Sequence, residues 1–99
     1  MVSYTNHKYY KKINKMKLIK LYATWCKPCV ELSEMLAEHN ISHESIDVDS
    51  LDGEGMISKY NVRALPTLIK FDDEGNLLDT LVGCPGTKEE LMKFIYASN

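Results

Sequence analysis

Apolar positions along this chain switch between short runs and helical repeats. Residues 17–23 form a short apolar run, which is typical of a buried strand. From Val30 to Leu36 the apolar residues recur at near-helical spacing, and glutamates occupy the other side. Pro28 falls in what would be the first turn of this helix, where a missing N–H is tolerated. The pattern therefore predicts a strand followed by an amphipathic helix that ends at residues 39–40.

The middle of the chain shows the same alternation once more. Residues 41–48 have the length and the branched apolar side chains of a second strand. In residues 52–60 the apolar side chains are spaced as on one face of a helix, after a region that contains Gly53 and Gly55. This spacing predicts a short second helix.

The last third of the chain predicts a hairpin and a helix. Residues 67–71 and 77–82 have strand character, and the polar segment 72–76 between them has the composition of a turn. Thr87 is a favourable N-cap residue with Glu90 three positions later, and apolar residues follow at helical spacing. We expect an antiparallel pair of strands and a closing helix.

The predicted order is strand, helix, strand, helix, strand, strand, helix. Strands that are joined through a helix normally lie parallel, because the crossover is right-handed. The 99 residues are enough for one hydrophobic core and rarely for two. We therefore expect a single α/β domain over residues 16–99, built as a three-layer sandwich with a mixed four-stranded sheet.

Basic residues are concentrated in one place, the N-terminal part of the chain. The formal net charge of -2 is too small to attract nucleic acid or an anionic membrane over the whole surface. Lysines and tyrosines interleave in the first part of the chain, but without arginine or a groove-reading motif, so we interpret residues 1–15 as a polar, basic leader. No apolar run is long enough for a secretory signal or a membrane span, and we expect a cytoplasmic protein.

The candidate chemistry lies in Cys26 and Cys29, two of the 3 cysteines in the chain. An odd number of cysteines argues against a secreted framework in which every sulfur is paired. Two cysteines at this spacing, between a strand and a helix, can close a small disulfide, and the first meets the partial positive charge of the helix N-terminus. We expect Cys26 to be the nucleophile and Cys29 the thiol that resolves the mixed disulfide.

The neighbours of the two cysteines favour the same chemistry. Lys27 places a cation beside Cys26, so we expect the pKa of Cys26 to lie below that of free cysteine. Pro28 stiffens the loop, and Trp25 offers a flat apolar surface on which a substrate can dock. A zinc site is the main alternative for such a pair, but it needs a second closely spaced pair of Cys or His ligands, which the sequence lacks. We expect neither a metal nor a cofactor.

The stretch from Trp25 to Cys29 resembles the WCxPC active site of the thioredoxin family, and the resemblance covers about residues 17–97. It is most similar to small thioredoxins of phages and archaea with a shortened N-terminus. The resemblance implies the thioredoxin fold and a monomeric protein-disulfide reductase that acts as an electron carrier. The partners implied are disulfide-containing proteins, a thioredoxin reductase as electron donor and ribonucleotide reductase as an acceptor.

A second segment carries the same resemblance. Leu65, Pro66 and Thr67 resemble the family's cis-proline segment, and Gly83 resembles the glycine that follows its last strand. In the family the cis-proline loop faces the two sulfurs and pairs with the backbone of an extended substrate. The resemblance therefore implies that Pro66 and Thr67 bind the substrate beside Cys26.

Lys20 departs from the family pattern. Thioredoxins have a buried Asp at this position, which is thought to handle the proton of the resolving thiol. An ammonium group here would favour the thiolates, but it has to be paired, solvated or neutral. Glu44 and Asp47 on the next predicted strand are candidate partners. In the alternative interpretation, Lys20 extends its amine to the surface and has no catalytic role.

Two other functions compete with the thioredoxin-like one. A glutaredoxin-like, glutathione-dependent reductase shares the core of the fold, but the segment from Gly83 to Thr87 lacks the acidic pair with which glutaredoxins hold glutathione. A thioredoxin-fold binding subunit would use no redox chemistry. Cys84, the third cysteine, is either a second reactive thiol or a small apolar filler.

Overall fold

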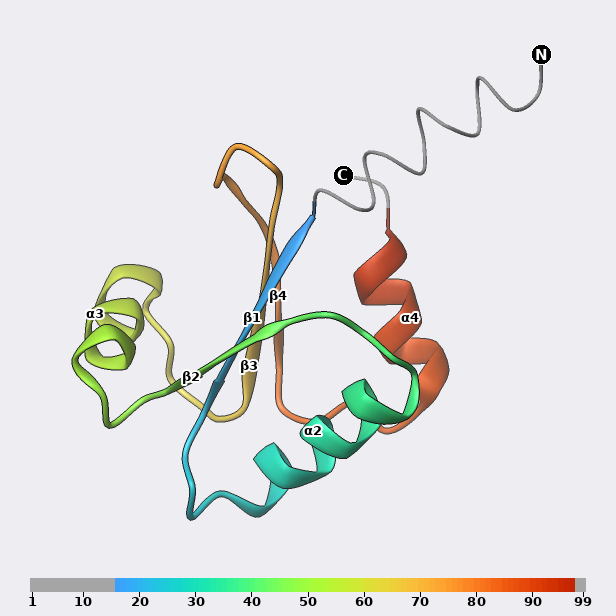
Figure 1. Cartoon of the computed structure of the whole chain (residues 1–99), viewed down its shortest axis with the longest axis horizontal. Coiled ribbons are helices and arrows are strands. Elements are labelled where there is room, and N and C mark those ends of the chain that lie inside the picture. Colours follow the sequence, from blue (N-terminus) through green and yellow to red (C-terminus); the bar gives the residue numbers. More distant parts are fainter. Residues whose placement is uncertain (1–15, 98–99) are drawn as a thin grey trace.

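The computed structural model of the chain describes residues 16–97, which fold as a four-stranded sheet between helices (Figure 1). Residues 1–15, interpreted above as a leader, lie outside the described residues. The predicted order of seven elements is confirmed. In chain order they are β1 (Lys17–Tyr22), α2 (Lys27–Glu38), β2 (Glu44–Asp47), α3 (Leu51–Tyr60), β3 (Thr67–Phe71), β4 (Leu77–Val82) and α4 (Lys88–Tyr96).

The strands lie in the order β2-β1-β3-β4. β1 runs parallel to β2 and antiparallel to β3, and β4 pairs antiparallel with β3 as the hairpin predicted. The mixed sheet is therefore confirmed, but the rule that strands joined through a helix lie parallel is wrong for β2 and β3. Asp47 and Thr67 lie at the same end of the sheet, beside the end of β1, so the chain leaves and re-enters the sheet at one end.

β2 is shorter than the predicted strand over 41–48. The N–H of Ile41 donates to the Leu36 carbonyl at 2.9 Å, and the ring of His43 hydrogen-bonds the Ile41 carbonyl at 2.9 Å. Residues 41–43 therefore complete the end of α2 instead of extending the sheet. The strands of the hairpin, by contrast, have the bounds that the sequence predicts.

The two faces of the sheet build two apolar layers. α3 covers one face, where Met56, Ile57 and Tyr60 pack on buried residues of β1 and β3. α2 and α4 cover the other face, with Leu32 and Leu91 fully buried (Figure 1). This three-layer arrangement fixes the start of α2 against the ends of β1 and β3. Within residues 16–97 no helix has the length and apolar character needed to span a membrane.

A buried lysine caps the C-terminal end of α4. Lys70 in β3 is 1% exposed, and its Nζ donates to the carbonyls of Phe94 at 2.8 Å and Ala97 at 3.2 Å. These carbonyls belong to the end of α4, where the helix dipole favours positive charge. Burial lowers the pKa of Lys70, whereas the charge of Asp79 raises it.

Candidate active site

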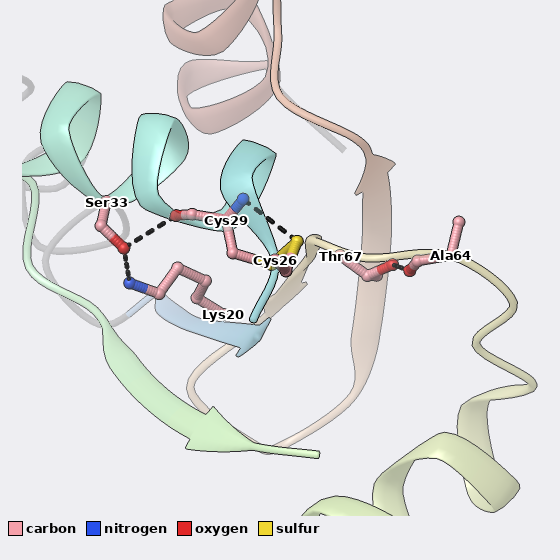
Figure 2. Close-up of a disulfide and its surroundings, with 6 residues drawn as sticks. All are labelled: Lys20, Cys26, Cys29, Ser33, Ala64 and Thr67. Atoms are coloured by element: carbon pink, nitrogen blue, oxygen red, sulfur yellow. Dashed lines mark hydrogen bonds between the residues drawn. A yellow bond between two sulfur atoms is a disulfide. The ribbon is translucent and has the colours of Figure 1, made fainter. Parts of the chain in front are cut away.

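The two cysteines of the WCxPC stretch meet where β1 ends and α2 begins. Cys26 is the N-cap residue of α2, and its N–H donates to the Ala23 carbonyl at 3.2 Å, which closes the turn after β1. Cys26 and Cys29 are joined as a disulfide, with their Cα atoms 5.3 Å apart. The N–H of Cys29 donates to Cys26 Sγ at 3.2 Å (Figure 2).

This position gives the two sulfurs different roles. A sulfur that accepts a hydrogen bond from a first-turn amide is stabilised as a thiolate, and the partial positive charge of the helix terminus acts in the same direction. Cys26 is 7% exposed and Cys29 is 2% exposed, so an incoming partner reaches the first sulfur more easily. Trp25 is 73% exposed beside them, and Lys27 and Pro28 are exposed in the first turn.

The segment that resembles the cis-proline loop lies beside the sulfurs. The Leu65–Pro66 peptide bond is cis, as the resemblance implied. The Gly83 N–H donates to the Pro66 carbonyl at 2.8 Å. Figure 2 shows the second hydrogen bond of this loop, in which Thr67 Oγ1 donates to the Ala64 carbonyl at 2.7 Å. Gly83 has a φ of +83°, a conformation that glycine adopts at little cost, so the residue after β4 can turn toward Pro66.

A groove of about 580 Å³ connects these two segments. One wall is the start of α2 with the exposed Trp25, and the other is the loop between α3 and β3. Its lining residues are Trp25, Cys26, Lys27, Pro28, Ile57, Val62, Arg63, Ala64 and Leu65. The groove is mostly apolar and opens beside the nucleophilic sulfur.

Lys20 lies behind the disulfide and is 5% exposed. Its Nζ donates to Ser33 Oγ, and Ser33 Oγ donates to the Cys29 carbonyl at 3.0 Å (Figure 2). The ring centroid of Tyr22 lies 5.4 Å from the amine. Burial lowers the pKa of Lys20, because the charged form loses its hydration.

The partners expected for Lys20 are wrong. Glu44 pairs instead with Lys17 at 3.3 Å, and Asp47 accepts a hydrogen bond from the Asp49 N–H at 2.9 Å. The interpretation in which Lys20 reaches the surface is also wrong, because the side chain is buried.

Sequence reasoning missed Ser33 as the partner of Lys20. Its signal was its place four residues after Cys29 on the same helix, from which a hydroxyl can reach the Cys29 carbonyl. Lys20, Cys29 and Ser33 also line one cavity of about 420 Å³.

Cys84 packs in a different apolar cluster from the disulfide. It is half-buried, its Sγ lies 3.9 Å from Met35 Sδ, and it contacts the cluster that contains Leu32 and Leu91, whereas Cys26 and Cys29 belong to the other cluster. Burial, and to a smaller extent the charge of Glu31, raises the pKa of Cys84. These observations favour the interpretation as an apolar filler. In the described part of the chain, no group of three or more His, Cys, Asp or Glu side chains is arranged to hold a metal ion.

Comparison with known proteins agrees with this geometry. The family model described as thioredoxin matches residues 1–97. The chain is 38% identical over 77 residues to thioredoxin-2 of Pyricularia oryzae, a match covering 73% of this chain and 43% of that protein. It is 36% identical over 73 residues to thioredoxin-1 of Caenorhabditis elegans, covering 71% of this chain and 63% of that protein.

A solved structure gives the same result for the fold. A mutant thioredoxin from Halobacterium salinarum superposes with a TM-score of 0.70 at 29% identity, covering 90% of this chain and 80% of that one. The matched region spans between about two fifths and two thirds of the two curated relatives described above. The match of the family model over nearly the whole chain, together with the cysteine pair and the cis-proline loop, shows that the chain belongs to the thioredoxin family.

Proposed function

We propose that this chain is a thiol–disulfide oxidoreductase that reduces disulfides in proteins by cycling Cys26 and Cys29 between the dithiol and the disulfide. The observation that carries the proposal is the position of Cys26 Sγ, which caps α2, accepts the Cys29 N–H at 3.2 Å and borders an open apolar groove. Its neighbour in sequence and space, Cys29, is close enough to displace any partner that becomes bound to it.

The two cysteines supply both electrons of the reaction. The Cys26 thiolate attacks one sulfur of a partner's disulfide, a new S–S bond forms, and the other partner sulfur leaves as a thiolate. Cys29 then loses its proton and attacks Cys26 Sγ, which releases the second partner sulfur as a thiolate. The two partner thiolates take up two protons, one given up by Cys29 and one from water, which received the proton of Cys26 when its thiolate formed. The partner has gained two electrons, and Cys26 and Cys29 are left as a disulfide.

Substrate binding is proposed for the two walls of the groove. Trp25, Lys27 and Pro28 would contact the partner on the α2 side, and Leu65 on the other. Pro66 and Thr67 have buried side chains and would take part through the backbone of the loop. Because the Pro66 and Ala64 carbonyls are held by Gly83 and Thr67, this loop offers a fixed edge to an extended chain.

Lys20 is proposed to modulate the proton of Cys29. The buried amine reaches the Cys29 backbone through Ser33 and shares a cavity with Cys29. Burial lowers the pKa of Lys20, so its amine exchanges a proton at a pH closer to neutral than that of a free lysine, and its protonated form favours a thiolate on Cys29. A lower pKa of Cys29 makes the second step of the reaction easier.

The variant Lys20→Met tests this role. We expect release of the partner from Cys26 to slow by about tenfold at pH 7, because a rise of one unit in the pKa of Cys29 removes that share of its thiolate. The pH profile of this step should move to higher pH, measured by stopped-flow resolution of a preformed mixed disulfide. Lys17→Met is the control, since Lys17 lies on the same strand but is exposed and paired with Glu44.

The stability of the Lys20→Met variant separates chemistry from folding. The pKa of Lys20 is lowered in the folded state, so the unfolded chain binds more protons between that lowered value and about 10.4. The wild-type free energy of unfolding should therefore rise with pH in this window, and the variant should lack that rise. A slow variant that is at least as stable as the wild type supports the proton role, whereas an unchanged pH profile of partner release contradicts it.

The donor and the acceptor of electrons are proposed from the family. We propose a thioredoxin reductase as donor, ribonucleotide reductase among the acceptors, and a cytoplasmic location. Reduction of insulin by the whole chain, with NADPH and thioredoxin reductase or with glutathione and glutathione reductase, tests the function and its donor together. We expect turnover with thioredoxin reductase; turnover through glutathione alone would support the glutaredoxin-like alternative, and no turnover with either would contradict the proposed reductase function.

A further inference from the structure

The described part of the chain is acidic, although the whole chain is nearly neutral. Residues 16–97 contain 8 Lys and Arg against 14 Asp and Glu. Two of these cations, Lys20 and Lys70, are buried and add little positive charge at the surface. Within residues 16–97, acidic side chains therefore outnumber the exposed basic ones.

The groove beside Cys26 departs from this pattern. Both charged residues that line it, Lys27 and Arg63, are cations, and no Asp or Glu is among its lining residues. Both side chains are exposed. The rest of the lining is mainly apolar and includes Ile57, Val62 and Leu65. The groove beside Cys26 thus combines an apolar lining with positive charge, whereas acidic residues outnumber basic ones in residues 16–97 as a whole.

The two cations come from opposite walls. Lys27 lies in the first turn of α2, directly after Cys26, and Arg63 lies in the loop between α3 and β3. Arg63 directly precedes Ala64, and Figure 2 shows Ala64 and Thr67 on the loop that faces the disulfide. An extended segment lying in the groove beside Cys26 would therefore have Lys27 on one wall and Arg63 on the other.

We propose that this groove selects partner disulfides whose cysteine is flanked by acidic residues next to an apolar one, and that Arg63 is a specificity-determining residue. This inference rests on the proposed function. Opposite charges speed the encounter of partners and like charges slow it, so Lys27 and Arg63 favour an acidic segment over a basic one at the groove itself. The apolar lining then accommodates a neighbouring apolar side chain.

Matched peptides test the proposal. Three peptides share one disulfide and one apolar residue beside it, and differ only in flanking residues that are glutamate, lysine or glutamine. The rate constant for reduction by the dithiol form of the whole chain is measured for each. At low ionic strength we expect the glutamate peptide to react about tenfold faster than the lysine peptide. The ratio should fall toward one in about 1 M salt, because screening then acts over a few ångströms.

Charge reversal locates the effect. Arg63→Glu should lower the glutamate-to-lysine rate ratio at least threefold. Lys59→Glu changes the net charge equally at an exposed position outside the groove and should leave the ratio near the wild-type value. Equal rates for the two charged peptides, or an equal loss of the ratio in both variants, would overturn the selectivity. Failure to reduce even the glutamine peptide would instead overturn the proposed reductase function.

Discussion

Replacement of Cys29 by serine is expected to trap partner proteins on Cys26. The variant retains the nucleophile at the N-terminus of α2, but the hydroxyl of serine cannot displace a sulfur from Cys26. Each partner disulfide that is attacked then stops at the mixed disulfide. Cys26→Ser removes the nucleophile itself and should lower the rate of disulfide reduction by more than about 1,000-fold. The serine hydroxyl stays protonated at neutral pH and supplies no thiolate for the attack.

Two measurements check this pair of variants. Turnover of insulin reduction should be lost in both, and only Cys29→Ser should form a covalent adduct with the partner that dithiothreitol reverses. Cys84→Ser is the matched control, because Cys84 packs against the apolar cluster that does not contain the disulfide and its pKa is raised by burial. It should retain most of the turnover. An adduct that forms on Cys84, or activity that survives Cys26→Ser, would show that Cys26 is not the nucleophile.

Local signals in the sequence predict most of the fold because they act over a few residues. The polar turn fixes the hairpin, so the bounds of β3 and β4 match the prediction. Thr87 caps α4 as its capping box predicts, and it accepts the Glu90 N–H at 3.2 Å. Cys26 begins α2 where the proline in the first turn places it.

Features that depend on distant residues could not be predicted in this way. The direction of β3 depends on the end of the sheet at which the chain returns, and no local pattern encodes that choice. The partner of Lys20 could not be chosen from charge alone, because the two carboxylates on the neighbouring strand are engaged by Lys17 and the Asp49 N–H. The hydroxyl of Ser33 meets Lys20 only once α2 is packed on β1.

Two glycines in α3 differ in a way that the local sequence pattern does not show. The sequence places Gly53 and Gly55 before the helix, but both lie inside it. A Cβ at Gly53 would lie 2.1 Å from the Asp47 carbonyl oxygen and 2.6 Å from the Val48 Cα, both backbone atoms, whereas a Cβ at Gly55 would meet nothing within 4 Å. The structure therefore distinguishes a glycine that lets α3 approach the end of β2 from one that only weakens the helix.

Gly53→Ala is expected to lower the free energy of unfolding by about 3 kcal/mol, because backbone atoms cannot move aside as a side chain can. Gly55→Ala should raise it by about 0.5–1 kcal/mol, since alanine is the better helix former. Urea denaturation of both variants measures the difference. A similar change in the two would show that α3 does not approach β2 so closely. Because α3 carries Ile57 and leads into the loop with Arg63, a displaced α3 should also weaken peptide reduction while leaving the closure of the Cys26–Cys29 disulfide intact.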